Sequence, residues 1–548
     1  MERFNPFLWR QARDWYRLAY LVAVGYFLWC AAQCYIPGKG FTGLISFGSG
    51  AEAHHIRELD EVGYFVDRDT PGYDGQYYAQ IAVKPLPGSR DLRAAVDNLP
   101  YRARRILFCW TAYGLGFGRP WLVLQVFALQ NVLCWLVLAW LLTRWFPATN
   151  LDNLVRWAGT LFAWGMTMSV RQSLMDGPSL LLIAVGLMLA EKGRPWASAC
   201  VLGVAGLGRE TNVLAGAVHL PGRDWSPREV GRAAARGALV VGPLLAWTAW
   251  LWWTFREPSD AGYQNVGAPL RAFLAKCGDV AAGIRANGWD SSAKWTLILL
   301  VAMTVQALAI LLRPQWTSPW WRVGAAFTAL AVFLGPSVWA GYPGAAPRVV
   351  LPMVLAFNAV LPRGRWWWPV LLLGNLTVLT APDELGPLGR ESFRIEGPKA
   401  VWRAPSNRTI DVTFGDEWYQ GERSTFEYWR WSRGSAAIVI TNPQPVAVEV
   451  ELDFDLRTFD PRTIRVYQGG TLRWEGPVGR TSAAVRLPGV RLEPGGTPWR
   501  FEAEGPPSHP DGETLRPVTF NLRNLVIRAV RTLDGGPPPP APAGPAPR

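Results

Sequence analysis

Histidine and cysteine are scarce in this chain of 548 residues, which has four histidines and six cysteines. Most of the cysteines lie inside apolar segments, and no two of them form a CxxC pair. This spacing excludes a disulfide framework and makes redox chemistry an unsuitable interpretation. His54-His55 stands among acidic residues, but the spacing has no metal-ligand pattern, so we expect a solvated acidic loop there.

One signature of nucleotide-binding proteins and one signature of serine hydrolases are also missing. The chain has no GxxxxGK[ST] phosphate-binding loop and no G-x-S-x-G elbow. Nucleotide-driven transport and serine hydrolysis therefore have no support in the sequence.

Long apolar blocks are abundant between Leu18 and Thr380. Several approach or exceed about 18 residues with few charges, which is enough to cross a bilayer. The net charge is +13, but the arginines flank the apolar blocks, which favours lipid and topology over nucleic acid. We therefore predict a polytopic α-helical membrane domain of about 9–11 spans over residues 1–381.

Charge bias gives this domain a topology. Positive charge before Leu18 places the N-terminus in the cytoplasm. Residues 37–118 then form an outer loop, and the part after about Pro382 is also outside. The predicted spans are Leu18–Ile36, Trp121–Leu142, Leu154–Val170, Pro178–Ala190, Gly237–Phe255, Trp295–Leu312, Val323–Ala340, Val349–Leu361 and Trp366–Thr380.

The segment Trp196–Leu220 has basic residues on both sides and "GLGRET" in its middle. If both of its ends are cytoplasmic, it cannot be one span. We expect a helical hairpin of two short arms with Arg209 and Glu210 at its tip, and a single long helix is the alternative.

The pattern changes near residue 382. Stretches of period two, separated by Pro, Gly, Asn and Asp, predict an all-β sandwich over 382–533. The Pro-rich end, 534–548, reads as a disordered tail. Trp418, Tyr419 or Tyr428 could bind glycan as aromatic platforms, although core packing is the simpler interpretation. Trp429 and Trp431 alternate with Tyr428 and Arg430, so one of these pairs is expected in the core.

The stretch "PGYDGQYYAQIA" in the outer loop carries unusual chemistry. Asp74 follows a Pro-Gly turn where a helix can begin, and Tyr77, Tyr78 and Ile81 share its helical face. Asp74 could simply cap an amphipathic interfacial helix. It could also act as a catalytic carboxylate at the outer face of the membrane.

Further charges accompany this stretch. The segment "VDNLPYRARRIL" places Tyr101 and three arginines (Arg102, Arg104 and Arg105) before an apolar run, Ile106 to Phe117, that is too short to span comfortably. The arginines could meet lipid headgroups or grip a substrate phosphate. Arg209 and Glu210 at membrane depth are functional candidates, and Asp176 and Arg348 recur near the outer face.

These motifs resemble membrane glycosyltransferases of the GT-C fold. "YDGQYYAQIA" looks like their first-loop motif, as in the protein O-mannosyltransferase and aminoarabinose-transferase group. With "DNLPYRARRIL", "GLGRET" and Arg348 it is closer to a bacterial group of GT-C-like proteins that read Tyr-Asp-Gly-Gln. The likeness covers about Leu18 to Thr380. In better-known members a Glu follows the Asp, whereas Gly75 stands here.

The resemblance implies a polyprenyl-phosphate sugar donor and a glycan, lipid or protein acceptor outside the cytoplasm. It implies an integral protein of the bacterial inner membrane, with Asp74 as the base. The expected substrate-binding residues are Gln76, Tyr77, Tyr78, Tyr101, Arg102, Arg104, Arg105, Asp176, Arg209, Glu210 and Arg348. No cofactor is certain, and a divalent metal is compatible. A transporter or flippase of lipid-linked glycans, or a non-catalytic scaffold displaying the β-domain, are the alternatives.

Overall fold

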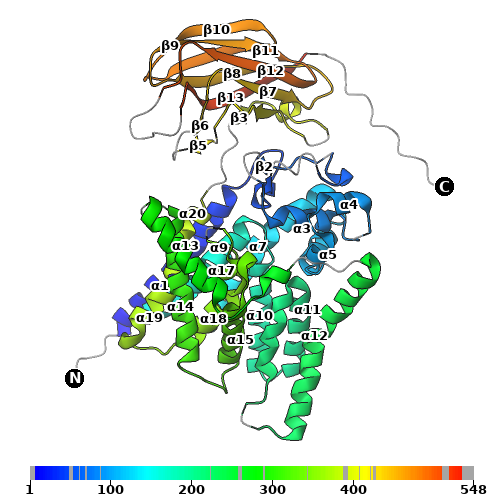
Figure 1. Cartoon of the computed structure of the whole chain (residues 1–548), viewed down its shortest axis with the longest axis vertical. Coiled ribbons are helices and arrows are strands. Elements are labelled where there is room, and N and C mark those ends of the chain that lie inside the picture. The colour runs from blue at the N-terminus through cyan, green and yellow to red at the C-terminus, as the bar shows by residue number, and fades with distance from the viewer. Residues whose placement is uncertain are drawn as a thin grey trace, which may run out of the picture. The chain divides into compact units, whose positions relative to one another are not determined.

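The computed structural model of the chain divides into two compact units (Figure 1). The helical unit is Met1–Ile36, Gly40–Asp60 and Phe65–Pro387, and the β unit is Pro37–Lys39, Glu61–Tyr64 and Leu388–Arg548. Our expected boundary lay at 381/382. The residues that the structure describes are 6–48, 54–60, 62–67, 71–86, 88–222, 224–256, 262–287, 291–341, 343–386, 393–405, 408–419, 421–423, 428–508 and 517–533. The Pro-rich tail, 534–548, lies outside them.

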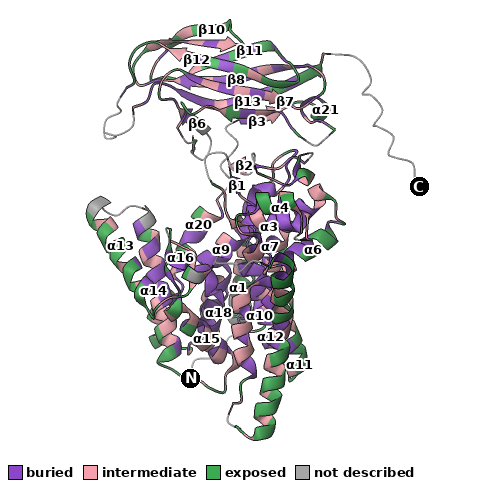
Figure 2. Ribbon diagram, turned by 45° about the vertical axis from the view of Figure 1, so that its right-hand side comes forward, coloured by how far each residue is buried: buried purple, intermediate pink, exposed green. Residues whose placement is uncertain are grey.

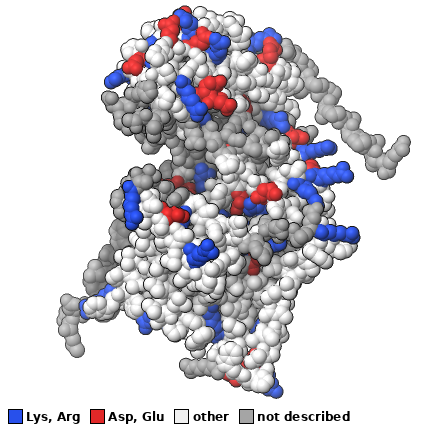
Figure 3. Space-filling model, viewed as in Figure 1, with Lys and Arg blue, Asp and Glu red and all other residues white. Residues whose placement is uncertain are grey.

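Four helices in the described residues are long and apolar enough to cross a membrane. They are α1 (Pro6–Ala32), α7 (Pro120–Leu142), α12 (Pro227–Phe255) and α14 (Ser291–Leu311). Large exposed apolar side chains on them include Trp29, Trp140, Trp252, Trp253 and Leu308. Large parts of the helical unit's surface in Figure 3 carry no charged side chain. An exposed apolar surface of this extent is typical of a protein that contacts lipid.

Several other predicted spans are interrupted or short. Leu154–Val170 is two helices, α8 (Leu151–Leu161) and α9 (Trp164–Arg171), so one continuous helix there was wrong. Val323–Ala340 divides into α15 (Pro319–Phe333) and α16 (Pro336–Trp339). Any side chain at Gly335, between these two helices, would collide with the carbonyl oxygen of Gln264. The expected number of spans is therefore not confirmed, because four helices have the required length.

Of the remaining predicted spans, Trp366–Thr380 is divided, whereas Pro178–Ala190 lies within one helix, α10, and α18 covers most of Val349–Leu361. The bounds here are α10 (Asp176–Glu191), α17 (Ala346–Val349), α18 (Leu351–Val360), η5 (Arg365–Trp367), α19 (Trp368–Gly374), η6 (Leu376–Thr380) and α20 (Ala381–Glu384). A helical rise of about 1.5 Å per residue makes the longest of these, α10, about 24 Å long, which is short of the hydrocarbon thickness.

The segment Trp196–Leu220 is a hairpin, as expected. Helix α11 (Pro195–Gly208) ends at Arg209, whose backbone is extended, and the 3₁₀ helix η3 (Glu210–His219) follows. The second arm returns along the first, because Asn212 donates to the Ala205 carbonyl at 2.8 Å and Ser198 lies 3.4 Å from His219. The alternative of a single long helix is excluded.

The outer loop is built from short elements. They are η1 (Thr42–Leu44), β1 (Phe47–Gly48), η2 (Arg57–Leu59), β2 (Val66–Asp67), α3 (Asp74–Val83), α4 (Arg90–Ala95), α5 (Leu99–Arg102) and α6 (Leu107–Leu115). Strands β1 and β2 pair in parallel. Helix α6 occupies the apolar run from Ile106 to Phe117, which is too short to span a membrane comfortably. Between α12 and α14 lie η4 (Tyr263–Asn265) and α13 (Arg271–Asn287), and α13 is largely exposed in Figure 2.

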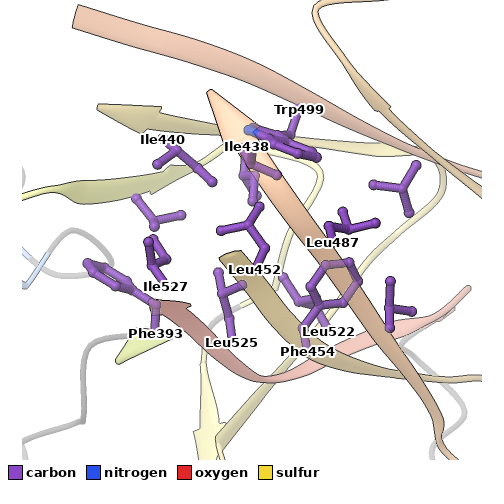
Figure 4. Close-up of a cluster of buried hydrophobic side chains, with 14 of the residues drawn as sticks. Phe393, Ile438, Ile440, Leu452, Phe454, Leu487, Trp499, Leu522, Leu525 and Ile527 are labelled. Atoms are coloured by element: carbon purple, nitrogen blue, oxygen red, sulfur yellow. The ribbon is translucent and has the colours of Figure 1, made fainter. Parts of the chain in front are cut away.

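The β unit contains two sheets with one shared core. The strand orders in the described residues are β10-β9-β12-β7-β4 and β11-β8-β13-β6-β5, with β3 parallel to β13. Alternate residues of β8 are buried, as expected for a strand with one face on a core. Phe454 of one sheet packs on Phe501 of the other at 5.8 Å between ring centroids. The sheets thus form a β-sandwich, with the core drawn in Figure 4.

The elements of the β unit have the following bounds. They are β3 (Phe393–Glu396), α21 (Lys399–Trp402), β4 (Asp411–Phe414), β5 (Glu422–Arg423), β6 (Tyr428–Trp431), β7 (Ala436–Asn442), β8 (Val448–Arg457), β9 (Arg462–Gln468), β10 (Thr471–Val478), β11 (Ala483–Leu492), β12 (Gly495–Ala503) and β13 (Asn521–Thr532).

The aromatic residues named as glycan platforms have different positions. Trp418 is buried in the core and its indole donates to the Ala437 carbonyl, so it cannot be a surface platform. Tyr419 is half-buried and donates to the Pro517 carbonyl. The side chain of Tyr428 lies outside what the structure describes. Arg430 is buried, whereas Trp431 is half-buried and stacks on Phe459.

Candidate functional site

A tight turn presents the first residues of α3. Gly72 has a φ of +74°, and a side chain there would press on the amide nitrogen of Gly48. Asp74 is the first helical residue, while Tyr73 occupies the N-cap position without a side-chain cap bond. Asp74 therefore does not cap this helix. Gln76 accepts from the Gly48 amide at 3.1 Å and donates to the Pro71 carbonyl at 3.0 Å, which holds the turn.

The surroundings of Gly75 explain why no glutamate follows Asp74 in this chain. A Cβ atom at this position would collide with the carbonyl oxygens of Gln172 and Ile45. The start of α3 therefore packs directly against neighbouring backbone, and no glutamate fits after Asp74.

Arg102 joins Asp74 to a second carboxylate. It lies 3.0 Å from Asp74 and donates two hydrogen bonds, of 3.0 and 2.8 Å, to Asp97. The guanidinium lies 5.0 Å above the ring of Tyr77 and 5.5 Å above that of Tyr78. Helices α3 and α5 thus bring the two quoted sequence stretches together.

Arg348 reaches Asp74 from α17, far along the chain. Its guanidinium lies 3.8 Å from Asp74 and 3.3 Å from Asp176, and it donates to the Tyr73 hydroxyl at 3.1 Å. Arg348 is 6% exposed, and its buried Nε has no hydrogen-bond acceptor among the described residues. One guanidinium nitrogen at the site is therefore unsatisfied within this part of the chain.

The hairpin tip completes the charge cluster. Arg209 pairs with Asp176, the first residue of α10. The neighbouring Glu210 lies 2.9 Å from Arg105, which also donates to the hydroxyls of Tyr78 at 2.7 Å and Tyr101 at 2.9 Å. The contacts therefore close into a ring, which we call the Asp74 ring: Asp74, Arg102, Tyr78, Arg105, Glu210, Arg209, Asp176 and Arg348.

Charge within this ring sets the ionisation of Asp74. Burial alone would raise the pKa of its carboxyl, but the guanidiniums of Arg102 and Arg348 outweigh burial and hold that pKa below the usual value. Asp74 is therefore a carboxylate at neutral pH. Its side chain is 30% exposed, so an incoming molecule can reach it.

Two predicted residues stand apart from the ring. Gln76 binds the turn, as described above. Arg104 lies 5.7 Å from the centroid of the Tyr101 ring, and the structure gives it no carboxylate partner among the described residues. Tyr77 and Tyr101 border the ring through Arg102 and Arg105.

Sequence reasoning missed several participants. Asp97 was part of the quoted stretch, and its place five residues before Arg102 was an available signal. Asn265 donates to the Tyr101 hydroxyl at 3.1 Å, and nothing in its segment signals this. Glu384 accepts from the Trp164 indole at 2.9 Å, and burial raises the pKa of this carboxyl.

An aromatic row lies beside the arginines. Trp110 of α6 contacts Trp247 of α12 at 4.9 Å, and Trp247 stacks on Trp250 at 4.7 Å between centroids. The Trp247 indole also donates to the Ala103 carbonyl, next to Arg104. Trp110 and Trp250 are exposed, so this row is an apolar surface that begins at the basic segment.

Metal ligands do not gather in the described residues, where no three His, Cys, Asp or Glu side chains lie together. His55 instead contacts Asp60 at 2.8 Å. Comparison of the chain with protein-family models, curated proteins and solved structures finds no match.

Proposed function

We propose that this protein is a membrane glycosyltransferase that moves a sugar from a polyprenyl-phosphate donor to an acceptor hydroxyl outside the cytoplasm. The observation that supports it most is the position of Asp74. This accessible carboxylate lies between two guanidiniums, Arg102 and Arg348, that come from distant parts of the chain. The carboxylate that we propose as the base is thus next to the cations that we propose to bind the phosphate.

The transfer chemistry requires both kinds of group. The acceptor oxygen forms a bond to the anomeric carbon as the bond between that carbon and the phosphate oxygen breaks. The acceptor proton passes to the Asp74 carboxylate, and the electron pair of the broken bond leaves on the phosphate. The guanidiniums of Arg102 and Arg348 stabilise the charge that develops there. Because a phosphate is a good leaving group, no general acid is needed.

Four guanidiniums and three carboxylates make up the ring and are paired with one another, so donor binding must redistribute these contacts. Arg348 has an unpartnered Nε, and Arg104 has no carboxylate partner among the described residues. Arg104 is half-buried and can meet a phosphate first, whereas the buried Arg348 Nε can donate only after the ring contacts have shifted. Asp176 and Glu210 hold Arg348, Arg209 and Arg105 and would keep their positions.

The aromatic row offers a surface for the donor's hydrocarbon chain. It is exposed, apolar and continuous with Arg104. A lipid with a phosphate head would satisfy both features at once. We accordingly propose a GT-C-like membrane domain in the bacterial inner membrane, with the N-terminus inside and the Asp74 ring and β unit outside.

The test is sugar transfer by membranes that contain the protein. They are supplied with a panel of labelled polyprenyl-phosphate sugars, and transfer to endogenous glycan, lipid and protein is followed. At least one donor should give a product that wild type forms and Asp74→Asn does not. If no donor is consumed while lipid-linked glycans cross the membrane, a flippase is the correct class.

A further inference from the structure

The first part of α12 carries a row of arginines unrelated to the Asp74 ring. Ser226 caps this helix by accepting from the Glu229 amide. Arg228, Arg232 and Arg236 then recur at every fourth position, which places them on one helical face. We call them the arginine stripe.

This end of α12 projects beyond its neighbour. The Arg236 guanidinium lies 5.6 Å over the ring of Trp196, which is at the start of α11. The residues from Pro227 to Arg236 therefore extend about 14 Å past that point, at about 1.5 Å per residue. They are mostly exposed in Figure 2, where the lower end of α12 stands away from the helix cluster.

Charge in the stripe is only partly neutralised. Arg232 pairs with Glu229, whereas Arg228 and Arg236 have no carboxylate partner among the described residues. The Nε of Arg236 is buried and lacks an acceptor within the part of the chain that the structure describes. Lys192 and Arg194, both exposed, add positive charge in the turn between α10 and α11.

Arg236 and Arg232 fit the depth expected of a lipid headgroup layer, whereas Arg228, about 12 Å beyond Arg236 along the helix, lies past it. The apolar part of α12 begins at Gly237, so Arg236 lies at the edge of the hydrocarbon and Arg232 about 6 Å beyond it. The polar layer on each side of a bilayer is roughly 5–7 Å thick. The exposed Trp196 beside Arg236 is a residue type favoured at this interface.

We propose that Arg232 and Arg236, with Trp196 and the Lys192–Arg194 turn, bind the phosphate of an anionic phospholipid. The phosphate oxygens would supply the acceptor that the Arg236 Nε lacks. This site is independent of the transferase activity, because it involves none of the residues of the Asp74 ring.

Lipid retention by the purified full-length protein tests the proposal. Native mass spectrometry counts phosphatidylglycerol and phosphatidylcholine adducts over a series of lipid concentrations. Wild type should prefer phosphatidylglycerol. The Arg232→Gln/Arg236→Gln double variant should bind it about 25-fold more weakly, since each basic residue near an anionic surface contributes roughly fivefold. Added salt should reduce the preference.

A control removes one positive charge elsewhere and is matched to Arg232→Gln. Arg365 is exposed, like Arg232, and lies 4.8 Å over a tryptophan ring, that of Trp366, yet it belongs to η5. Arg365→Gln should change phosphatidylglycerol binding less than twofold. Equal binding of both lipids by wild type, or equal loss in the double variant and Arg365→Gln, overturns the proposal. So does retention of nucleic acid or a protein in place of the lipid. If the double variant fails to fold, Arg232→Gln alone tests the proposal, because Arg232 is exposed. It should weaken phosphatidylglycerol binding more than Arg365→Gln does.

Discussion

Replacing Asp74 by Asn tests the proposed base most directly. The two carboxylate oxygens face different guanidiniums, at 3.0 Å from Arg102 and 3.8 Å from Arg348. Asn can accept from one of them, but its amide group then faces the other. Because Asp74 is 30% exposed, we expect this to cost about 1 kcal/mol of stability, the lower end of the penalty for an unsatisfied buried polar group. Because Asp74 does not cap α3, no capping energy is lost.

The effect on catalysis should be much larger. An amide cannot take the acceptor proton, and loss of a general base typically lowers the rate by about 100-fold or more. Turnover by Asp74→Asn should therefore fall by about 100-fold at saturating donor, measured as labelled-sugar transfer per amount of folded protein.

Donor binding should become tighter in Asp74→Asn, although turnover falls. The substitution removes a negative charge beside the cations that would hold the phosphate. Two unit charges about 6 Å apart interact by roughly 3 kcal/mol at an effective dielectric constant of about 20. Exposure of the site reduces this, so we expect polyprenyl phosphate to bind about tenfold more tightly to Asp74→Asn. Inhibition and direct binding by polyprenyl phosphate measure this change.

Asp97→Asn is the matched control, because Asp97 binds the same guanidinium but is 42% exposed. It should lower turnover less than tenfold. If Asp97→Asn and Asp74→Asn lose turnover equally, Asp74 acts only by orienting Arg102. Weaker phosphate binding in Asp74→Asn, with normal turnover, would refute the base outright.

Four further outcomes are expected. Arg105→Gln should raise the KM for donor about tenfold or more and change kcat less, because it loosens a cation of the ring; an unchanged KM would contradict this. Since burial raises the pKa of the Glu384 carboxyl, its ionised form costs stability at pH values above its unfolded pKa. Glu384→Gln should thus raise Tm at pH 8 and not near pH 4, whereas a gain at both would exclude ionisation as the cause. Residues 388–533 contain the strands of both sheets, so this fragment should be soluble and unfold cooperatively by circular dichroism; aggregation would mean that its core is incomplete. Reporter fusions at Asp383 and Arg228 should read opposite sides of the membrane, and a shared side would refute the topology.

Local sequence patterns predicted some of these features well. The period-two stretches of the C-terminal part became strands with alternating burial, such as β7 and β8. Basic residues on both sides of Trp196–Leu220 predicted the helical hairpin formed by α11 and η3. The Pro-Gly turn before Asp74 marked the first residue of α3. Each of these follows from residues within about 25 positions of one another, which is the range over which periodicity and charge bias act.

Interruptions of apolar helices were not predictable in this way. The backbone breaks at Phe162 and Ala163, although residues 157–170 contain no proline and no charge. At Gly335 the break depends on the Gln264 backbone, which approaches from a different part of the chain. Hydropathy averages over such points, because a short helix buried in a bundle is as apolar as a span.

For the Asp74 ring, too, the sequence indicated which residues take part but not which of them contact one another. Charge at membrane depth selected Arg209 and Glu210 as candidates, since such residues are costly without a partner. Asp176 and Arg348 were selected by their positions near the outer face. The sequence could not assign the partners, because every arginine is compatible with every carboxylate until the chain is folded. Glu384 was missed for the opposite reason. It follows the last apolar block, where an acidic residue costs nothing, and only its burial beside Trp164 distinguishes it from a surface residue.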